Sequence, residues 1–263
     1  MQRVVYTAIL GNYEEFSQPD YPVKPGTQRL VFTDNADLKS DGWTVVPVKP
    51  RFANDSIRSA RYLKIMGPAL FADKDQSLWI DNTVRLKASP DKILDLLLAD
   101  ADIALPYHSY RETLAAEFGA VQAAGYDDFT KIYEQLFHYQ TSHRDVLSQR
   151  PFWTGMMARC HKPNVTSAMT VWWEHILRYS RRDQLSINLA LQSSPLRLFC
   201  YELDTLESQL HKWPVYSSRN HAKTAQNSIL DAIQDIPAAR LAKLEYENEE
   251  LRRQLAQTQL SAS

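Results

Sequence analysis

The chain has 263 residues, which corresponds to one or two domains and is long enough to bury a substantial core. Its 30 lysines and arginines almost balance its 31 aspartates and glutamates, and the net charge of −1 argues against a general nucleic-acid binder or a polybasic membrane-surface protein. The two cysteines, Cys160 and Cys200, provide neither a disulfide framework nor a cysteine-rich zinc site.

The N-terminal segment favours a cytoplasmic protein. The chain becomes polar at Gly11-Asn12-Tyr13, too early for the apolar region of a secretory signal peptide. No window approaches the roughly 18 apolar residues that a membrane-spanning helix needs. We therefore predict a cytoplasmic location and no transmembrane segment, which agrees with the low cysteine content.

The first half of the chain alternates strand-like and helix-like patterns. Short runs with the composition of buried strands are found at 4–10, 29–33, 43–48, 77–80 and 103–105. Apolar residues have helical spacing in 56–71 and, after a Ser89 N-cap, in 90–99. This alternation predicts an α/β fold in which a mostly parallel sheet has helices on both faces.

The second half is more helical. Residues 112–142 carry two apolar stripes at helical spacing and predict a helical insertion. After the insertion, strands are expected at 152–158 and 196–201, and helices at 165–179 and 184–191 between them. We place the compact domain at residues 1–222.

Residues 223–263 are predicted to form a separate helical tail. From Pro237 to Leu260 the chain contains no further Gly or Pro, and a heptad repeat places these residues at its a and d positions: Leu241, Leu244, Asn248, Leu251 and Leu255. An asparagine at an a position favours a two-stranded register. The pattern therefore predicts a short coiled coil and a parallel homodimer through residues 237–260; the alternative is a single helix that packs on its own domain.

A carboxylate follows the strand expected at 77–80. Asp81 and Asn82 stand at its carboxyl end, where open α/β sheets place their ligands. Nucleotide-sugar transferases use an acidic motif here to hold Mg²⁺ or Mn²⁺ against a diphosphate, because these ions prefer oxygen ligands. Position 83 is threonine instead of the usual second acid. We expect a divalent cation at Asp81 and the late histidine His221; a turn-capping role for Asp81 is the alternative.

A second polar set lies between two expected helices. Arg182, Asp183 and Gln184 precede or open the helix at 184–191, where Asp183 is either an N-cap or part of a sugar site. A carboxylate beside an amide can form hydrogen bonds to neighbouring hydroxyl groups of a sugar, and a nearby arginine can neutralise the charge of a phosphate. Of the histidines, the best placed for a site at the strand ends are His108 and His211 or His221. The sequence has no nucleophile elbow and no glycine-rich phosphate loop, which argues against serine hydrolases, kinases and Rossmann dehydrogenases.

Five stretches in this order resemble a glycosyltransferase-like family of plants and bacteria that was long catalogued as a domain of unknown function: residues 6–13, 31–35, 61–65, 79–82 and 172–186. The plant members are linked to cell-wall and mucilage polysaccharides. The resemblance covers residues from about 3 to about 192. It implies a GT-A-like fold and a nucleotide-sugar donor.

The resemblance also implies roles for individual residues. The residues implied to bind the donor are Thr7, Gly11, Asn12, Tyr13, Asp34, Arg61, Lys64, Asp81 and Asn82. Arg61 and Lys64 would face the diphosphate, and Asp183 with Gln184 would contact sugar hydroxyls. His108 and Arg111 match a His-x-x-Arg stretch of the family, and His108 is taken as a third catalytic candidate.

We therefore predict a glycosyltransferase that moves a sugar from a nucleotide-diphosphate donor to a glycan or lipid-linked acceptor. The alternative is a non-catalytic scaffold or nucleotide-sugar-binding protein with the same fold, dimerised by its tail. The incomplete acidic motif at Asp81 and the heptads of the tail favour that alternative. Binding of nucleotide sugars would distinguish a transferase from a scaffold without ligands.

Overall fold

The computed structural model describes residues 1–12, 14–71, 73–215, 248, 251 and 252. The chain divides into two units, Met1–Arg219 and Asn220–Ser263. In the second unit, Asn248, Leu251 and Arg252 are helical. The remainder of the tail lies outside the described residues, so the coiled coil and the homodimer stay predictions. Nowhere in the described part of the chain does a helix combine the length and apolar character needed to cross a membrane.

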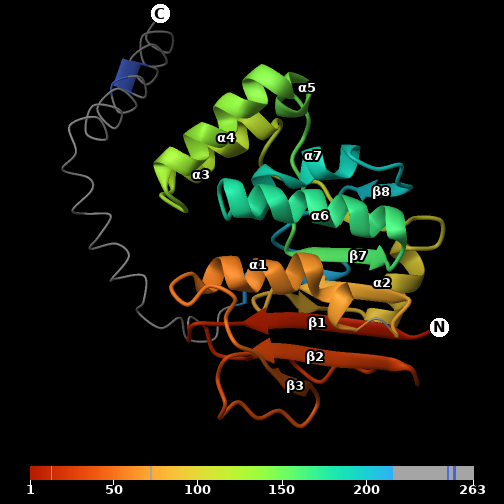
Figure 1. Ribbon diagram of the computed structural model, residues 1–263. Coiled ribbons are helices and arrows are strands. Elements are labelled where there is room, and N and C mark those ends of the chain that lie inside the picture. The colour runs from red at the N-terminus through yellow and green to blue at the C-terminus, as the bar shows by residue number, and fades with distance from the viewer. Residues whose placement is uncertain (13, 72, 216–247, 249–250, 253–263) are drawn as a thin grey trace, which may run out of the picture. The chain divides into compact units, whose positions relative to one another are not determined.

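The first unit contains a seven-stranded sheet with the order β3-β2-β1-β4-β7-β6-β8 (Figure 1). Its strands are β1 (Arg3–Ile9), β2 (Thr27–Thr33), β3 (Thr44–Pro47), β4 (Gln76–Ile80), β6 (Ile103–Pro106), β7 (Met156–Cys160) and β8 (Leu198–Tyr201). A separate two-stranded sheet pairs β5 (Arg85–Leu86) with β9 (His211–Lys212). The helices are α1 (Ser56–Met66), η1 (Gly67–Leu70), α2 (Pro90–Leu97), α3 (Leu114–Ala123), α4 (Phe129–Ser142), α5 (Arg144–Leu147), α6 (Pro163–Arg178), η2 (Asp183–Leu185) and α7 (Ile187–Gln192). The predicted α/β class is confirmed.

The seven-stranded sheet is mostly parallel, with β7 reversed between β4 and β6. The helical insertion begins after β6 and ends before β7 at the same edge of the sheet, so β7 runs antiparallel to its neighbours β4 and β6. As a consequence, the carboxyl ends of the six other strands and the amino end of β7 share one edge. This edge carries the candidate site.

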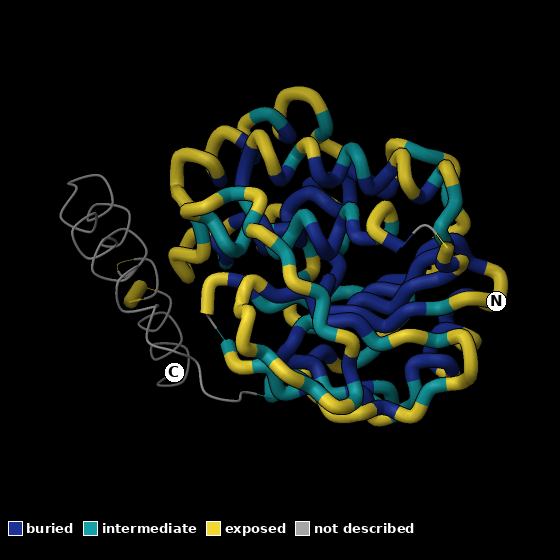
Figure 2. Tube along the Cα trace, turned by 60° about the horizontal axis from the view of Figure 1, so that its bottom comes forward, coloured by how far each residue is buried: buried dark blue, intermediate teal, exposed yellow. Residues whose placement is uncertain are grey.

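Both faces of the sheet are covered because side chains alternate along each strand. On β1, Val4 and Tyr6 pack into a core with α1, α6 and α7, whereas Val5 packs into a second core with α2. Figure 2 shows that the buried segments lie at the centre of the unit. Every residue of β4, β6 and β7 is buried, whereas the edge strands β3 and β8 have no buried residue. A third apolar cluster joins α3, α4 and α5 to η2 and α7. Of these helices, α3 and α4 form the insertion expected at 112–142.

A proline and a glycine set the ends of helices in two of the expected helical regions. The helix expected over 56–71 ends at Met66 and continues as the tighter η1, which contains Pro68. Proline lacks the N–H that an α-helix requires in its interior. The insertion is divided between α3 and α4 at Gly125, whose φ of 61° belongs to the left-handed region that glycine adopts readily.

Candidate active site

The expected site residues come together at the shared edge of the sheet. Gly11 follows β1, Asp34 follows β2, Asp81 follows β4 and His108 follows β6, while Thr154 precedes the reversed strand β7. Since these strands are neighbours and end at one edge, residues from distant parts of the sequence become adjacent.

A buried carboxylate, Asp183 of η2, forms the centre of the site. Its side chain is 2% exposed. Its Oδ2 accepts hydrogen bonds from Lys64 Nζ at 2.5 Å and from Thr154 Oγ1 at 3.0 Å, and lies 3.4 Å from Arg61 Nε. Trp172 Nε1 donates to the main-chain oxygen of Asp183 at 3.0 Å. Arg61 and Lys64 are three residues apart on α1, so the helix presents both on one face.

The charges of this cluster depend on one another. Burial alone would raise the pKa of Asp183, but Arg61, Lys64 and Arg182 outweigh it and hold that pKa well below its usual range. Burial also lowers the pKa of Lys64, and Asp183 and Asp81 oppose that effect. For Arg61, the carboxylates of Asp183, Asp81 and Glu14 outweigh burial and raise the pKa. The site therefore holds buried charges of both signs at neutral pH.

Asp81 shares the Lys64 ammonium with Asp183. Asp81 Oδ1 accepts a hydrogen bond from Trp79 Nε1 at 2.8 Å and lies 3.6 Å from Lys64 Nζ. Its side chain is 31% exposed, in contrast to the buried Asp183. The two carboxylates noted in the sequence thus meet at one cation, and Asp81 is the one that faces solvent.

Asn82 joins the end of β4 to the segment that follows β1. Its Nδ2 donates to Glu14 Oε2 at 3.1 Å and to the main-chain oxygen of Glu15 at 2.9 Å. Its main-chain oxygen accepts from Gln18 Nε2 at 2.8 Å. Asn82 is 6% exposed, so it holds this loop in place from within. No sequence pattern predicted that Glu14 and Gln18 contact Asn82, because only the fold brings their loop against the end of β4.

The turn after β1 depends on glycine. Gly11 has a φ of 75°, and a Cβ there would lie 2.5 Å from Ser56 Cβ. Its N–H donates to both carboxylate oxygens of Asp34, at 3.1 and 3.0 Å. Asn12 has a φ of 51° and is exposed. Asp34 therefore braces the turn of its neighbouring strand, while its side chain remains at the surface.

Two further residues of the expected donor site, Thr7 and Tyr13, are not among the described side chains at the edge of the sheet. Thr7 is fully buried in β1, and among the described residues its Oγ1 has no hydrogen-bond partner. Tyr13 lies outside the described residues. The structure therefore places Thr7 beneath the site and within the sheet.

Arg182 and Gln184 lie on the side of the site that faces the insertion. Arg182 NH2 donates to Gln184 Oε1 at 3.0 Å, and its guanidinium lies 4.7 Å from the ring centre of Tyr126. Gln184 is 7% exposed. The amide and the guanidinium noted in the sequence are thus paired with each other and stand beside Asp183.

A buried glutamate of α3 joins this side of the site. Glu117 Oε2 lies 3.2 Å from Arg111 Nε. Burial raises the pKa of Glu117, whereas Arg182 and Arg111 lower it. Glu117 was not among the residues expected in the site. Its position three residues after Leu114 places it on the buried side of α3. An acidic residue within an apolar helical stripe could have identified it from the sequence.

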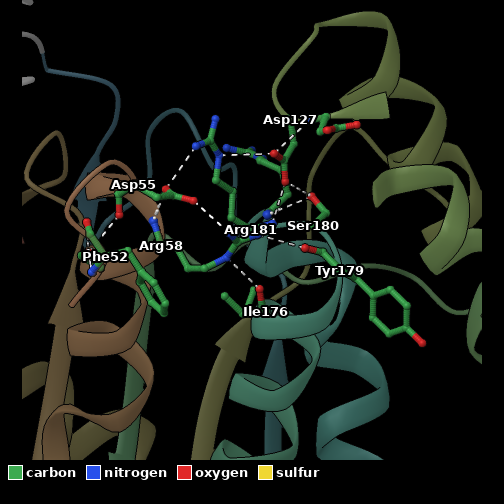
Figure 3. A network of polar contacts seen from close by, with 11 residues as sticks. Phe52, Asp55, Arg58, Asp127, Ile176, Tyr179, Ser180 and Arg181 are labelled. Carbon is green, nitrogen blue, oxygen red and sulfur yellow. Dashed lines mark hydrogen bonds and ion pairs between the residues drawn. The ribbon is translucent and has the colours of Figure 1, made fainter. Parts of the chain in front are cut away.

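Ser180 and Arg181, which directly precede Arg182 in the sequence, have a structural role (Figure 3). Arg181 NH1 lies 3.1 Å from Asp55 Oδ1, and Arg181 Nε lies 3.3 Å from Asp127 Oδ1. Ser180 Oγ donates to Asp127 Oδ2 at 2.7 Å, and Arg58 Nε donates to the main-chain oxygen of Ile176 at 3.0 Å. This network ties the start of α1 to the end of α6 and to the insertion, so it positions the helices that carry Lys64 and Asp183.

His108 is arranged as a neutral hydrogen-bond donor. The main-chain N–H of Tyr110 donates to His108 Nδ1 at 3.1 Å, which assigns the ring proton to Nε2. Burial and then the charges of Arg111, Arg150 and Arg182 lower the pKa of His108 to about 4. His211, by contrast, is buried between Thr205 and Ser208 and has a structural role.

We expect the ring of His108 to stay neutral from pH 8 to pH 5. Its ¹⁵N chemical shifts should change with a midpoint near pH 4, because the folded state opposes its protonation. In urea the same ring should titrate at about 6.5, as an unperturbed histidine does. A folded-state midpoint near that ordinary value would contradict this assignment.

The described residues do not complete the expected metal site. In the ranges that the structure describes, no group of three histidine, cysteine or acidic side chains is arranged to hold a metal ion. The ammonium of Lys64 lies beside Asp81, and the hydroxyl of Thr83 accepts a hydrogen bond from Trp213 Nε1 at 3.1 Å. His221 lies outside the described residues. The divalent cation therefore stays a prediction.

A family model and a plant relative agree with the resemblance seen in the sequence. The model of the TOD1/MUCI70, glycosyltransferase-like domain matches residues 27–197. The probable hexosyltransferase MUCI70 of Arabidopsis thaliana is 29% identical over 157 residues, which cover 56% of this chain and 27% of that protein. Among solved structures, the apo structure of the bifunctional glycosyltransferase WbbM has a TM-score of 0.44 and 14% identity, and the match covers 76% of this chain and 38% of that one. The chain thus spans less than a third of the length of its plant relative.

Proposed function

Because this chain belongs to the TOD1/MUCI70 glycosyltransferase-like family, we propose that it is a GT-A-like glycosyltransferase that transfers a sugar from a nucleotide-diphosphate donor to a glycan or lipid-linked acceptor. The family match includes α1 and the segments that carry Asp81 and Asp183. The similarity to the plant relative, a probable hexosyltransferase, supports a hexose as the transferred sugar. The cytoplasmic location predicted from the sequence is part of the same proposal.

Two buried guanidinium groups with unused donors carry the proposal. In the described part of the chain, five arginines have a buried Nε without a hydrogen-bond partner: Arg61, Arg111, Arg159, Arg181 and Arg182. Of these, Arg61 and Arg182 act electrostatically on Asp183 at the centre of the site, and Arg61 Nε lies 3.4 Å from Asp183 Oδ2. Buried donors normally have an acceptor, so such groups at an edge of the sheet indicate a ligand. Guanidinium groups match the geometry of phosphate oxygens. A nucleoside diphosphate provides these acceptors.

The arrangement also suggests how transfer would proceed. When the bond between the anomeric carbon and the diphosphate breaks, negative charge develops on the leaving group, and Arg61 and Lys64 are positioned to stabilise it. Asp183 is buried and already bonded to Lys64, so we assign it the role of positioning that ammonium. Asp81 is the more exposed carboxylate and is proposed to bind a hydroxyl of the donor sugar.

Calorimetric titration with uridine, guanosine and cytidine diphosphate sugars tests the proposal. We expect one donor class to bind, and Arg61→Met to weaken its binding by about ten- to a hundredfold, the effect of losing a hydrogen bond to a charged group. Arg178→Met is the control, because Arg178 is an exposed arginine of α6 and its side chain pairs with Glu134. Its binding should equal that of the wild type.

The same titration separates the alternatives. Absence of binding by every donor would reject the transferase and favour the non-catalytic scaffold, whereas equal binding by Arg61→Met would reject the role of Arg61. Repeating the titration with Mn²⁺ and with a chelator tests the predicted cation. Tighter binding with Mn²⁺ would support a metal held between Asp81 and the donor.

A further inference from the structure

A shallow cavity of about 470 Å³, largely open to solvent, lies at the same edge of the sheet as the candidate active site. It is lined by Ser109, Tyr110, Arg150, Glu202, Leu203 and Asp204. These residues belong to the segments that follow β6 and β8 and to the segment that leads into β7. The parallel pairing of β6 with β8 brings these segments together. The volume is in the range of small-molecule sites, about 300–1,000 Å³.

His108 connects this cavity to the candidate active site. Arg150 Nε and NH2 donate to the main-chain oxygen of His108 at 3.3 and 3.2 Å. Both Arg150 and Arg182 lower the pKa of His108, so the ring lies within electrostatic reach of both guanidinium groups. A ligand in the cavity would therefore lie next to Arg150, the residue that holds the main chain of His108.

The walls of the cavity are held by contacts between its own segments. Ser109 Oγ donates to the main-chain oxygen of Leu203 at 2.8 Å, and Tyr110 OH donates to Asp204 Oδ1 at 3.2 Å. Arg150 NH1 lies 2.5 Å from Glu202 Oε1, and its guanidinium packs over the ring of Tyr107. The ring of Tyr110 is nevertheless exposed, since this residue has 52% of its surface accessible. The cavity thus presents an aromatic ring beside fixed charged groups.

We propose that this cavity binds the neutral saccharide acceptor, a subsite that rests on the proposed glycosyltransferase function. An exposed aromatic ring packs against the C–H face of a pyranose, while carboxylates accept and a guanidinium donates hydrogen bonds to its hydroxyls. Glu202 and Asp204 outnumber Arg150 among the charged lining residues. This excess of negative charge disfavours a phosphate or an acidic sugar, and so favours a glycan over a lipid-linked pyrophosphate.

Binding of defined oligosaccharides to the full chain tests this subsite. The probes are neutral tetrasaccharides of glucose, galactose, mannose or N-acetylglucosamine, with tetragalacturonate as the acidic comparison, measured by saturation-transfer NMR and calorimetry. We expect at least one neutral probe to bind and the acidic probe to bind more weakly. Tyr110→Ala should weaken binding at least tenfold, whereas Tyr110→Phe, which keeps the ring, should change it less than threefold.

Tyr133→Ala is the matched control, because Tyr133 of α4 is 56% exposed and lies outside the cavity. Its binding should equal that of the wild type, and circular dichroism verifies that each variant is folded. The proposal is overturned if no neutral probe binds, if the acidic probe binds best, or if Tyr110→Ala binds like Tyr133→Ala.

Titrating the same proteins with nucleotide sugars separates the two proposals. Nucleotide binding without saccharide binding would reject this subsite alone. Saccharide binding without nucleotide binding would reject the proposed donor and leave a carbohydrate-binding site.

Discussion

Replacing Asp183 by alanine is expected to destabilise the first unit by about 3–5 kcal/mol, the cost of leaving a buried charge without its partner. Lys64 has no exposed side-chain surface, and its ammonium is bonded to Asp183 at 2.5 Å. The variant would also remove the carboxylate next to Arg61. Urea unfolding of the wild type and the variant measures the difference.

Asp95→Ala is the control for this prediction. Asp95 pairs with Arg3 and Lys24, but its side chain is 48% exposed, so its loss should cost less than about 1 kcal/mol. The double variant Lys64→Met, Asp183→Leu removes both charges and should recover much of the loss. Equal destabilisation by Asp183→Ala and Asp95→Ala would show that the buried pair is not a main source of stability.

The contribution of Asp183 to the free energy of unfolding should decrease as the pH falls. The pKa of Asp183 is lower in the folded state than in the unfolded state, where it is about 4. The contribution is therefore complete above that pH and is lost as the pH falls through the folded value. Asp183→Ala should lack this part of the acid dependence.

Replacing Asp81 by asparagine is expected to reduce sugar transfer by about ten- to a hundredfold, the effect of losing a hydrogen bond to a charged group, and to change the free energy of unfolding little. Asp81 is partly exposed, and an asparagine Oδ1 can still accept the hydrogen bond of Trp79 Nε1. What the variant removes is the charged acceptor proposed to bind a hydroxyl of the donor sugar. Turnover is measured as release of the nucleoside diphosphate from the donor that the titrations identify.

Asp95→Asn, a surface change remote from the strand ends that carry the site, is the control and should keep full turnover. If Asp81→Asn also keeps full turnover, Asp81 does not contact the donor. If it instead lowers stability as much as Asp183→Ala does, Asp81 is part of the structural ion pair. Either result would leave the proposed donor site supported by Arg61, Lys64 and Arg182 without Asp81.

Local patterns in the sequence were sufficient to predict the class of the fold. Strands such as β1 and β4 are short apolar runs between polar turns, and α6 has apolar residues at helical spacing. These signals are local, because they depend on which face of an element is buried. The direction of β7 is not local: its buried residues would suit either direction, and only the return of the insertion to the same edge of the sheet reverses it.

The sequence by itself identified the residue types that surround the candidate site, including Lys64, Asp81 and Asp183, and their resemblance to a family. Only the tertiary structure decided their partners. Lys64 and Asp183 are 119 positions apart, and the packing of α1 against η2 makes them a buried pair. The neighbours Arg181 and Arg182 look equivalent in the sequence, yet one belongs to the network that joins helices and the other stands beside Asp183. The physical reason is that burial and the position of opposite charges set the role of an ionisable side chain, and both arise only when distant segments pack together.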